Sequence, residues 1–317
     1  MNSNNLTESK ILEKIKMEVK DKVCIITGSA QGLGKAFAKI LLHNGAKVCL
    51  SDMKEDALKT TFNEFVDFYG NGNVYFVQCD VTKDSDFNNL FDEAERFFNV
   101  NCIDMLVNNA GIGMHLGWRK CLDVNIVGLM NGCEIALHRM KAASKSGTVV
   151  NISSMSGVIA RGGEDVMGYT VSKHANIALT KTLADDISNH GISFKVLCPA
   201  WADTELVSTL KETLRKERLP DLEKQIQKVG GLMTPEFVAK GFYKLVTECK
   251  NGTVLWVMKD TPYIIMPNDA LPKVLLGVGI ARLIGRFSET DLITPLHQIL
   301  FILIFFFVVI FFFCCLI

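Results

Sequence analysis

The stretch IITGSAQGLGKAFA, residues 25–38, joins a short apolar run to a helical pattern through three glycines. Glycine at such a turn lets the backbone bend sharply and lets a ligand approach it closely. The helix that begins there offers unpaired N–H groups and a partial positive charge, which suit a pyrophosphate. The spacing is G-x-x-x-G-x-G, which differs from the G-x-G-x-x-G fingerprint. The predicted anion-binding residues of this loop are Gly28, Gln31, Gly32, Leu33 and Gly34.

Short β-rich runs alternate with helical segments from residue 22 to about residue 258. The runs are KVCIIT, AKVCLS, NVYFVQC, IDMLVN, GTVVNIS, ISFKVLC and TVLWVM. Strands that alternate with helices form βαβ units and a parallel sheet covered on both faces. The sequence therefore predicts an α/β fold: a single Rossmann-type, doubly wound domain over residues 21–260, after a polar extension at residues 1–20.

Polar residues follow the carboxyl ends of the predicted strands, where ligands of such folds bind. Asp52 ends the second run, where an acid can accept hydrogen bonds from adenosine ribose hydroxyls. A carboxylate there repels a 2′-phosphate and favours NAD over NADP, although the nearby Lys54 weakens that exclusion. Asp80 and Val81 follow the third run, where the adenine would lie, and Asn109 follows the fourth run in VNNAG.

The stretch GYTVSKHANIALTKTLADDI, residues 168–187, has helical spacing and begins with Tyr169 and Lys173. Residues four apart lie on the same face of a helix, so the phenol lies beside the ammonium. Taken alone, this pattern fits an ordinary surface pair as well as a catalytic one. The remaining segments of the chain decide between these two interpretations.

Together, the segments TGSAQGLG, CDV, NNAG, DVNIVG, NISS, YTVSK and LCPA resemble the short-chain dehydrogenase/reductase family in their order. The resemblance covers roughly residues 20–260. It implies a Rossmann-fold oxidoreductase that uses a nicotinamide cofactor. Within the family, the glycine loop, QCDV and SKHA are most similar to the NAD-dependent branch that acts on hydroxyprostaglandins.

The resemblance implies a catalytic tetrad of Asn125, Ser154, Tyr169 and Lys173. Tyr169 would be the general acid/base, with the Lys173 ammonium lowering the pKa of its phenol from about 10 towards the working pH. Ser154 would hydrogen-bond the substrate oxygen. Lys173 would also hold the nicotinamide ribose, and Asn125 would hold a water that links Lys173 to solvent.

The gap from Ser154 to Tyr169 is longer by two residues than the family's usual gap. Ser153 and Ser156 are therefore alternatives, and Ser156 would restore the usual gap. Ser154 is preferred because it stands in NISS, three residues before Gly157.

Two further departures concern the substrate and the nicotinamide. The hydroxyprostaglandin branch carries a substrate-contacting Gln three residues before its Tyr, and this chain has Val166 there. The family's Pro-Gly after the sixth strand is Pro199-Ala200 in this chain. Pro199 and Thr204 remain among the predicted cofactor contacts, with Thr204 near the carboxamide.

Composition excludes several classes of function. Basic and acidic residues both number 34, and no basic stripe stands out, so nucleic acid is not an expected partner. The ten cysteines form no CxxC pair and the six histidines lack metal-ligand spacing, so no metal site is expected. Free thiols in apolar runs indicate a reducing compartment. The resembling family commonly forms dimers and tetramers, so a homo-oligomer is expected.

The last residues, 299–317, read ILFILIFFFVVIFFFCCLI and contain no charge. As a helix they would be ~28 Å long, about one hydrocarbon core. We expect a C-terminal transmembrane anchor that leaves the large domain in the cytosol, with the endoplasmic reticulum as the expected membrane. CCLI also fits prenylation at Cys314, and Cys314 and Cys315 are alternatively palmitoylated or simply apolar. The connector at residues 261–298 lies either in the membrane interface or buried.

These features predict an NAD-dependent oxidoreductase that interconverts a secondary alcohol and a ketone on a lipid-like substrate of the hydroxy-eicosanoid, steroid or retinoid class. The charged helical segment at residues 205–231 is placed where an insertion would cover the site. An NADP-dependent carbonyl reductase is an alternative, against which Asp52 counts. A non-catalytic membrane protein that senses dinucleotide is another, against which the intact tetrad counts.

Overall fold

The computed structural model describes residues 19–160, 163–186, 190–214, 218–260 and 263–266. In this part of the chain, strands form one sheet in the order β3-β2-β1-β4-β5-β6-β7-β8. The strands are β1 Val23–Thr27, β2 Lys47–Asp52, β3 Val74–Gln78, β4 Met105–Asn108, β5 Gly147–Ile152, β6 Ile192–Pro199, β7 Val254–Val257 and β8 Ile264–Met266. The strand order reverses between β1 and β4, which confirms the predicted doubly wound arrangement.

The strands from β1 to β7 pair in parallel, and β8 pairs antiparallel with β7. Each parallel strand matches one of the apolar runs of the sequence. The antiparallel strand lies beyond the predicted domain boundary at residue 260, within the segment interpreted as a connector. Its three residues were too short a pattern to indicate a strand.

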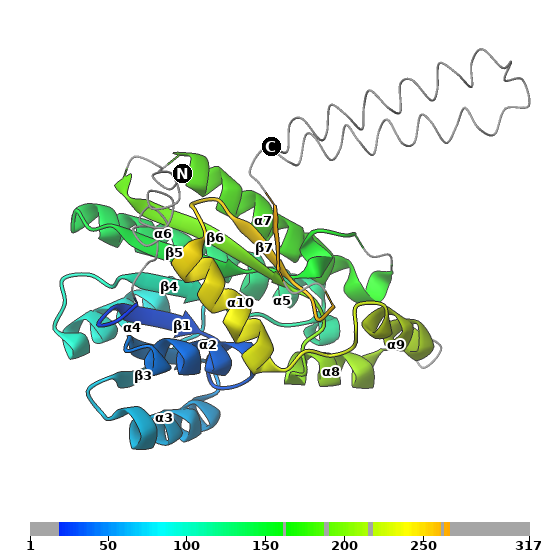
Figure 1. Cartoon of the computed structure of the whole chain (residues 1–317), viewed down its shortest axis with the longest axis horizontal. Coiled ribbons are helices and arrows are strands. Elements are labelled where there is room, and N and C mark those ends of the chain that lie inside the picture. The colour runs from blue at the N-terminus through cyan, green and yellow to red at the C-terminus, as the bar shows by residue number, and fades with distance from the viewer. Residues whose placement is uncertain (1–18, 161–162, 187–189, 215–217, 261–262, 267–317) are drawn as a thin grey trace, which may run out of the picture. The chain divides into compact units, whose positions relative to one another are not determined.

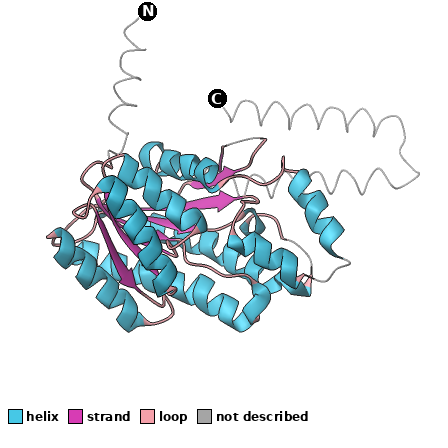
Figure 2. Cartoon of the chain, turned by 90° about the horizontal axis from the view of Figure 1, so that it is seen from below, coloured by secondary structure: helices cyan, strands magenta, loops and turns pink. Residues whose placement is uncertain are grey.

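Helices cover both faces of the sheet (Figures 1 and 2). On one face lie α2 Gly32–His43, α3 Glu55–Tyr69 and α10 Pro235–Glu248, and on the other lie α4 Asp84–Phe98, α6 Gly128–Ala142 and α7 Met167–Asp186. Each face has its own apolar core. In the first core, Phe37 and Phe242 stack with ring centroids 4.5 Å apart. In the second, Phe87 and Phe91 of α4 are fully buried.

Shorter elements lie around the carboxyl ends of the strands. α5 Trp118–Leu122 continues through a π-helical turn, Asp123–Val127, into α6. α8 Glu205–Thr213 and α9 Leu219–Gln227 follow β6, and Figure 1 shows both at the lower right of the view. Short 3₁₀ turns span Met114–Leu116, Met155–Gly157 and Glu164–Val166.

The predicted anchor at residues 299–317 lies outside the described residues, as do residues 1–18 of the polar extension and most of the connector. Among the described helices, none has the length and the apolar character that crossing a membrane requires.

Candidate active site

The glycine loop between β1 and α2 leaves no room for a side chain at Gly28 or Gly34. Gly28 and Gly32 have φ angles of +65° and +57°, which favour glycine. A Cβ on Gly34 would lie 2.2 Å from the Gly28 carbonyl oxygen and 2.5 Å from Asn109 Nδ2. Asn109 Nδ2 donates to the carbonyls of Thr27 and Gly28 at 3.0 and 2.9 Å. Asn109, one of the predicted cofactor contacts, therefore holds the backbone of the glycine loop in place through its side chain.

The start of α2 is suited to an anion. Gln31 is the N-cap, with an extended backbone, and its side chain makes no capping hydrogen bond. The first N–H groups of the helix thus have no side-chain cap, and they lie beside the backbone of the glycine loop. This cradle fits the pyrophosphate of a dinucleotide, and Leu33 follows it, lining a neighbouring cavity.

Asp52 lies at the end of β2, held against the glycine loop. Its carboxylate accepts from the N–H of Ala30 at 3.2 Å and from the N–H of Lys54 at 3.0 Å. This leaves further lone pairs for the hydroxyls of a ribose. The geometry therefore fits the predicted role of Asp52 towards an adenosine.

Asp80 and Val81 lie after β3. The Asp80 carboxylate accepts from the Thr82 N–H and hydroxyl at 3.1 and 2.7 Å. Partial burial raises the pKa of Asp80, but the Thr82 hydrogen bonds and the nearby Lys120 and Lys83 together outweigh it, and the pKa is lowered overall. Val81 is buried against Gly128, where a Cβ would lie 2.6 Å from its Cγ2. The Val81 side chain thus belongs largely to the core.

Tyr169 and Lys173 lie in the first turns of α7, on one face of the helix as the sequence predicts. Lys173 Nζ is 5.5 Å from the centroid of the Tyr169 ring and donates to the Ile152 carbonyl at 2.9 Å. Burial lowers the pKa of Lys173 to about 8, opposed by the nearby Cys121 and Cys198. Tyr169 is half-buried and lines the cavity described below.

Asn125 lies in the π-helical turn, a distortion that is frequent at functional sites. Its Oδ1 accepts from the Ile112 N–H at 2.8 Å, and its Nδ2 donates to the Ile112 carbonyl at 3.0 Å and to Ser172 Oγ at 3.1 Å. A Cβ on Gly111 would lie 3.2 Å from Asn125 Oδ1 and 3.5 Å from Lys173 Nζ. These contacts fix the Asn125 side chain between Ile112 and α7.

The three serines after β5 are placed differently. Ser153 is buried, and its hydroxyl donates to the Lys173 carbonyl at 2.6 Å, so it faces α7 rather than a substrate. All three serines line the cavity. Ser154 Oγ also accepts from the Ser156 N–H at 3.1 Å, which fixes its side chain. The bond from Ser153 to α7 counts against Ser153 as the substrate contact, and the geometry is compatible with Ser154.

The cavity beside Ser154 and Tyr169 is mainly apolar. The lid, which we define as α8 and α9 with the flanking residues Leu214 and Arg218, forms one wall. Its apolar lining side chains are Leu206, Val207, Leu210, Leu214 and Leu222, and Arg218, Asp221 and Gln225 of the same segment also line the cavity. Met114, Met155, Val166 and Trp201 complete the apolar lining. The sequence predicted an insertion over the site but gave no signal for the individual lid residues.

An ion pair ties the lid to the loop before α7. Arg218 Nη1 lies 3.3 Å from Asp165 Oδ2, and both residues line the cavity. A Cβ on Gly163, where φ is +124°, would lie 2.5 Å from Arg218 Nη1. Neither Asp165 nor Arg218 was among the predicted site residues, because no motif surrounds them.

Pro199 and Thr204 lie where β6 leads into the lid. Pro199 ends the strand and lines the cavity, and Thr204 is the N-cap of α8. A Cβ on Gly32 would lie 3.5 Å from Thr204 Cγ2. The start of the lid therefore lies next to the glycine loop. The described residues contain no group of three or more His, Cys, Asp or Glu that could hold a metal ion.

Comparisons with known proteins agree with this geometry. The family model described as short chain dehydrogenase matches residues 22–215. Mouse 15-hydroxyprostaglandin dehydrogenase [NAD(+)] is 30% identical over 247 residues, covering 75% of this chain and 90% of the mouse protein. The 3-oxoacyl-[acyl-carrier-protein] reductase of Aquifex aeolicus is 29% identical over 245 residues, covering 73% of this chain and 93% of its own length.

Among solved structures, a short-chain type dehydrogenase/reductase from Mycobacterium marinum is similar, with a TM-score of 0.67 and 26% identity. The match covers 75% of this chain and 94% of that chain. The family match, the sheet order and the site geometry coincide over the same residues. The chain therefore belongs to the short-chain dehydrogenase family, oxidoreductases of alcohols and ketones whose fold binds a nicotinamide dinucleotide.

Proposed function

We propose that this protein is an NAD-dependent dehydrogenase that interconverts a secondary alcohol and a ketone on a lipid-like substrate. The observation that carries the proposal is the placement of Ser154 and Tyr169 on a mainly apolar cavity. An apolar cavity with a few convergent polar groups suits a hydrophobic molecule with one reactive oxygen. Asp52 supports NAD over NADP, because its carboxylate would repel a 2′-phosphate.

The catalytic residues would share the work of alcohol oxidation. The Ser154 hydroxyl donates a hydrogen bond to the substrate oxygen, and the Tyr169 phenolate accepts the hydroxyl proton. The Lys173 ammonium, 5.5 Å from the Tyr169 ring centroid, stabilises the phenolate. Bound NAD supplies the acceptor for the hydride that leaves the carbinol carbon. In the reverse direction Tyr169 returns the proton to the carbonyl oxygen.

The proposed substrate class is a hydroxy-lipid such as a hydroxy-eicosanoid, a steroid or a retinoid. The 15-hydroxyprostaglandin dehydrogenases among the relatives support an oxidised lipid alcohol. Val166 supports a substrate that differs from a hydroxyprostaglandin. It lines the cavity at the position where the hydroxyprostaglandin branch carries a polar Gln. An apolar side chain there favours a substrate with less polar surface near its reactive carbon.

The test is NADH fluorescence from the full-length protein in mild detergent, offered NAD and a panel of hydroxy-eicosanoids, steroids and retinol. Tyr169→Phe should lower the rate by about 10²–10⁴-fold and leave dinucleotide binding intact, because it removes the proton acceptor alone. Tyr243→Phe, on α10, is the matched control and should keep the wild-type rate. Full turnover by Tyr169→Phe would refute the assigned chemistry.

The proposed membrane anchor is residues 299–317, supported by their unbroken apolar sequence. It would hold the catalytic domain on the cytosolic side of the endoplasmic reticulum, close to substrates dissolved in the membrane. Alkaline carbonate extraction of microsomes tests this. The full chain should stay with the membrane pellet and remain open to added protease, and a chain that ends at residue 298 should be released.

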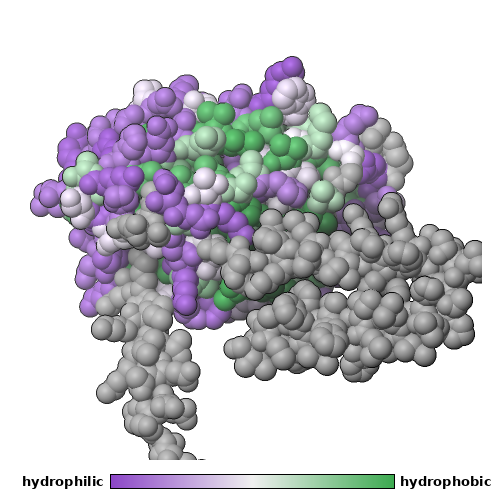
Figure 3. All heavy atoms as spheres, turned by 90° about the horizontal axis from the view of Figure 1, so that it is seen from above, coloured by the Kyte–Doolittle hydropathy of each residue, from purple (hydrophilic) through white to green (hydrophobic). Residues whose placement is uncertain are grey.

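The proposed assembly is a homo-oligomer. Apolar side chains are exposed on the helices from α5 to α7: Trp118, Val127, Met130, Met167 and Val171. Figure 3 shows one face on which apolar residues gather between polar margins. Exposed apolar area of this kind is typical of an interaction surface. Sedimentation velocity in detergent should give a mass of at least two chains.

A further inference from the structure

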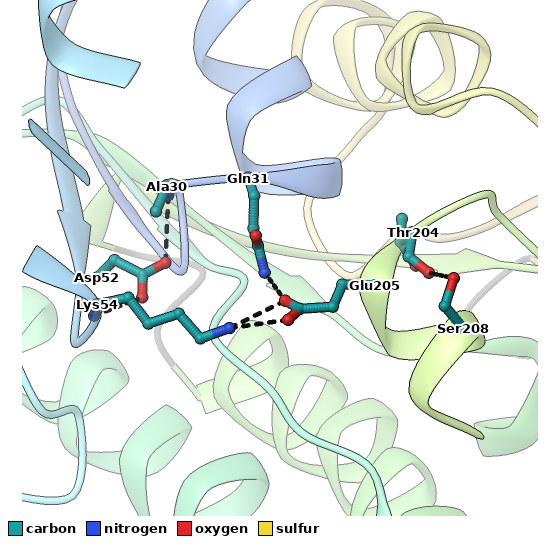
Figure 4. A network of polar contacts seen from close by, with 7 residues as sticks. All are labelled: Ala30, Gln31, Asp52, Lys54, Thr204, Glu205 and Ser208. Atoms are coloured by element: carbon teal, nitrogen blue, oxygen red, sulfur yellow. Dashed lines mark hydrogen bonds and ion pairs between the residues drawn. The ribbon is translucent and has the colours of Figure 1, made fainter. Parts of the chain in front are cut away.

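Glu205, the first residue of the lid helix α8, contacts two places on the dinucleotide side of the site (Figure 4). Its carboxylate accepts from Lys54 Nζ through both oxygens, at 3.1 and 3.0 Å. It also accepts from the Gln31 side chain, the N-cap of α2. A single carboxylate of the lid thus joins the residues that flank the predicted pyrophosphate and ribose positions.

Lys54 is placed to affect the choice of cofactor. It follows Asp52 by two residues, and its N–H donates to the Asp52 carboxylate at 3.0 Å. A cation at this position is what a 2′-phosphate of NADP needs, since dinucleotide folds that use NADP place a basic side chain near that phosphate. In this chain the Lys54 ammonium is instead paired with Glu205.

We propose that Glu205 is a specificity-determining residue, which holds the Lys54 ammonium away from the 2′-phosphate of NADP and so reinforces the selection of NAD by Asp52. The inference rests on the proposed use of NAD. With Glu205 present, two carboxylates and one ammonium surround the ribose position, and their net charge is negative. Without Glu205, the charges of Asp52 and Lys54 cancel. The Lys54 ammonium, no longer paired with Glu205, can then attract the dianionic 2′-phosphate.

The expected change in NADP affinity depends on how exposed Lys54 and Glu205 are. The side chains of Lys54 and Glu205 are each 54% exposed, so solvent and salt screen their attraction. The loss of the Glu205 charge removes a repulsion and releases Lys54, and both changes favour NADP. We expect about a tenfold gain in NADP affinity at low salt, shrinking as salt is raised.

The experiment measures equilibrium binding of NAD and NADP to the full-length protein by isothermal titration calorimetry at low salt. Glu205→Gln keeps the size of the side chain and removes its charge. It should tighten NADP binding about tenfold and change NAD binding by less than about threefold. Glu212→Gln, on the same helix and exposed, is the matched control and should change neither.

The double variant Glu205→Gln/Lys54→Met separates the two residues. The gain in NADP affinity should disappear in it, because the released cation is gone. A gain that persists without Lys54, or an equal change for NAD and NADP in Glu205→Gln, would overturn the assignment. If the wild type bound NADP as tightly as NAD, the proposed NAD preference itself would fail, and this outcome is visible before any variant is made.

Discussion

The two walls of the cavity are held in place in different ways. The catalytic wall, formed by the end of β5 and by α7, is tied by buried hydrogen bonds, such as those from Lys173 to Ile152 and from Ser153 to Lys173. The lid buries few side chains. In α8 only Val207 is buried, and in α9 only Leu222 and Ile226 are buried.

The ion pairs of the lid are also partly exposed. They join Glu205 to Lys54 and Arg218 to Asp165, near the start of each lid helix. Segments with few buried contacts open at low cost in free energy. The difference teaches that the reacting groups lie on the part held by buried hydrogen bonds, whereas the lid, which lines the cavity, is held by few buried side chains and by partly exposed ion pairs.

Gly34→Ala tests the rigid part of the molecule, and we expect it to have the largest effect. A methyl group there would lie 2.2 Å from the Gly28 carbonyl oxygen, so the loop must shift. We expect a loss of about 1–3 kcal/mol in the free energy of unfolding, and dinucleotide affinity about 10–100-fold weaker. Urea unfolding and calorimetric titration measure the two quantities.

Gly72→Ala is the control for this change, since a Cβ there meets no atom within 4 Å. It should leave both quantities near the wild-type values. Wild-type dinucleotide affinity in Gly34→Ala would mean that the glycine loop does not contact the cofactor.

Leu210→Ala tests the contribution of the lid to substrate binding. It removes part of the apolar lining, so we expect KM for a long-chain lipid alcohol to rise about fivefold. Dinucleotide affinity and the urea midpoint should stay unchanged, because the lid contributes little to the core. Lys211→Ala, exposed on the same helix, is the control. A fall in stability comparable to that of Gly34→Ala would show that the lid is part of the rigid core.

The stability of the rigid part at alkaline pH depends on its buried thiols. We expect this pH dependence to be the smallest of the effects. Burial raises the pKa of Cys102 to about 11 and of Cys133 to about 12, against about 8.5 for a free thiol. Above pH ~8.5 the unfolded chain loses thiol protons that the folded chain keeps, so stability falls as pH rises. The lowered pKa of Lys195, about 8, acts in the opposite sense, because the folded chain loses that proton first.

The described cysteines that show this effect outnumber the buried lysines, so the urea midpoint should fall between pH 7.5 and 9.5 under reducing conditions. Lys195→Met removes one opposing contribution and should steepen the fall. A midpoint that rises over this interval would show that the lysines dominate.

Most of the catalytic wall could be predicted from the sequence. Its residues sit in local motifs, and backbone geometry alone brings Tyr169 next to Lys173. The sequence favoured Ser154 over Ser153 and Ser156 but could not show the contact of Ser153 with the Lys173 carbonyl, because that contact joins two separate elements. β8 was missed because three residues give no reliable alternation.

The lid was predicted as a segment but not residue by residue. Glu205 and Lys54 are 151 positions apart, and no spacing rule links a surface carboxylate to a distant lysine. Leucines at helical spacing in α8 and α9 fit a wall of a cavity and an ordinary core equally well. Only the folded arrangement decides which neighbours they have.

The buried cysteines have a practical consequence for following this protein in cells. All eight described cysteines are buried, so a thiol-reactive label should react with them only when the chain opens. Labelling at Cys24 or Cys198, read peptide by peptide in a mass spectrometer, would report the unfolded fraction of the catalytic domain. The protein therefore carries its own chemical reporter of folding, and destabilised variants can be recognised in intact cells without an activity assay.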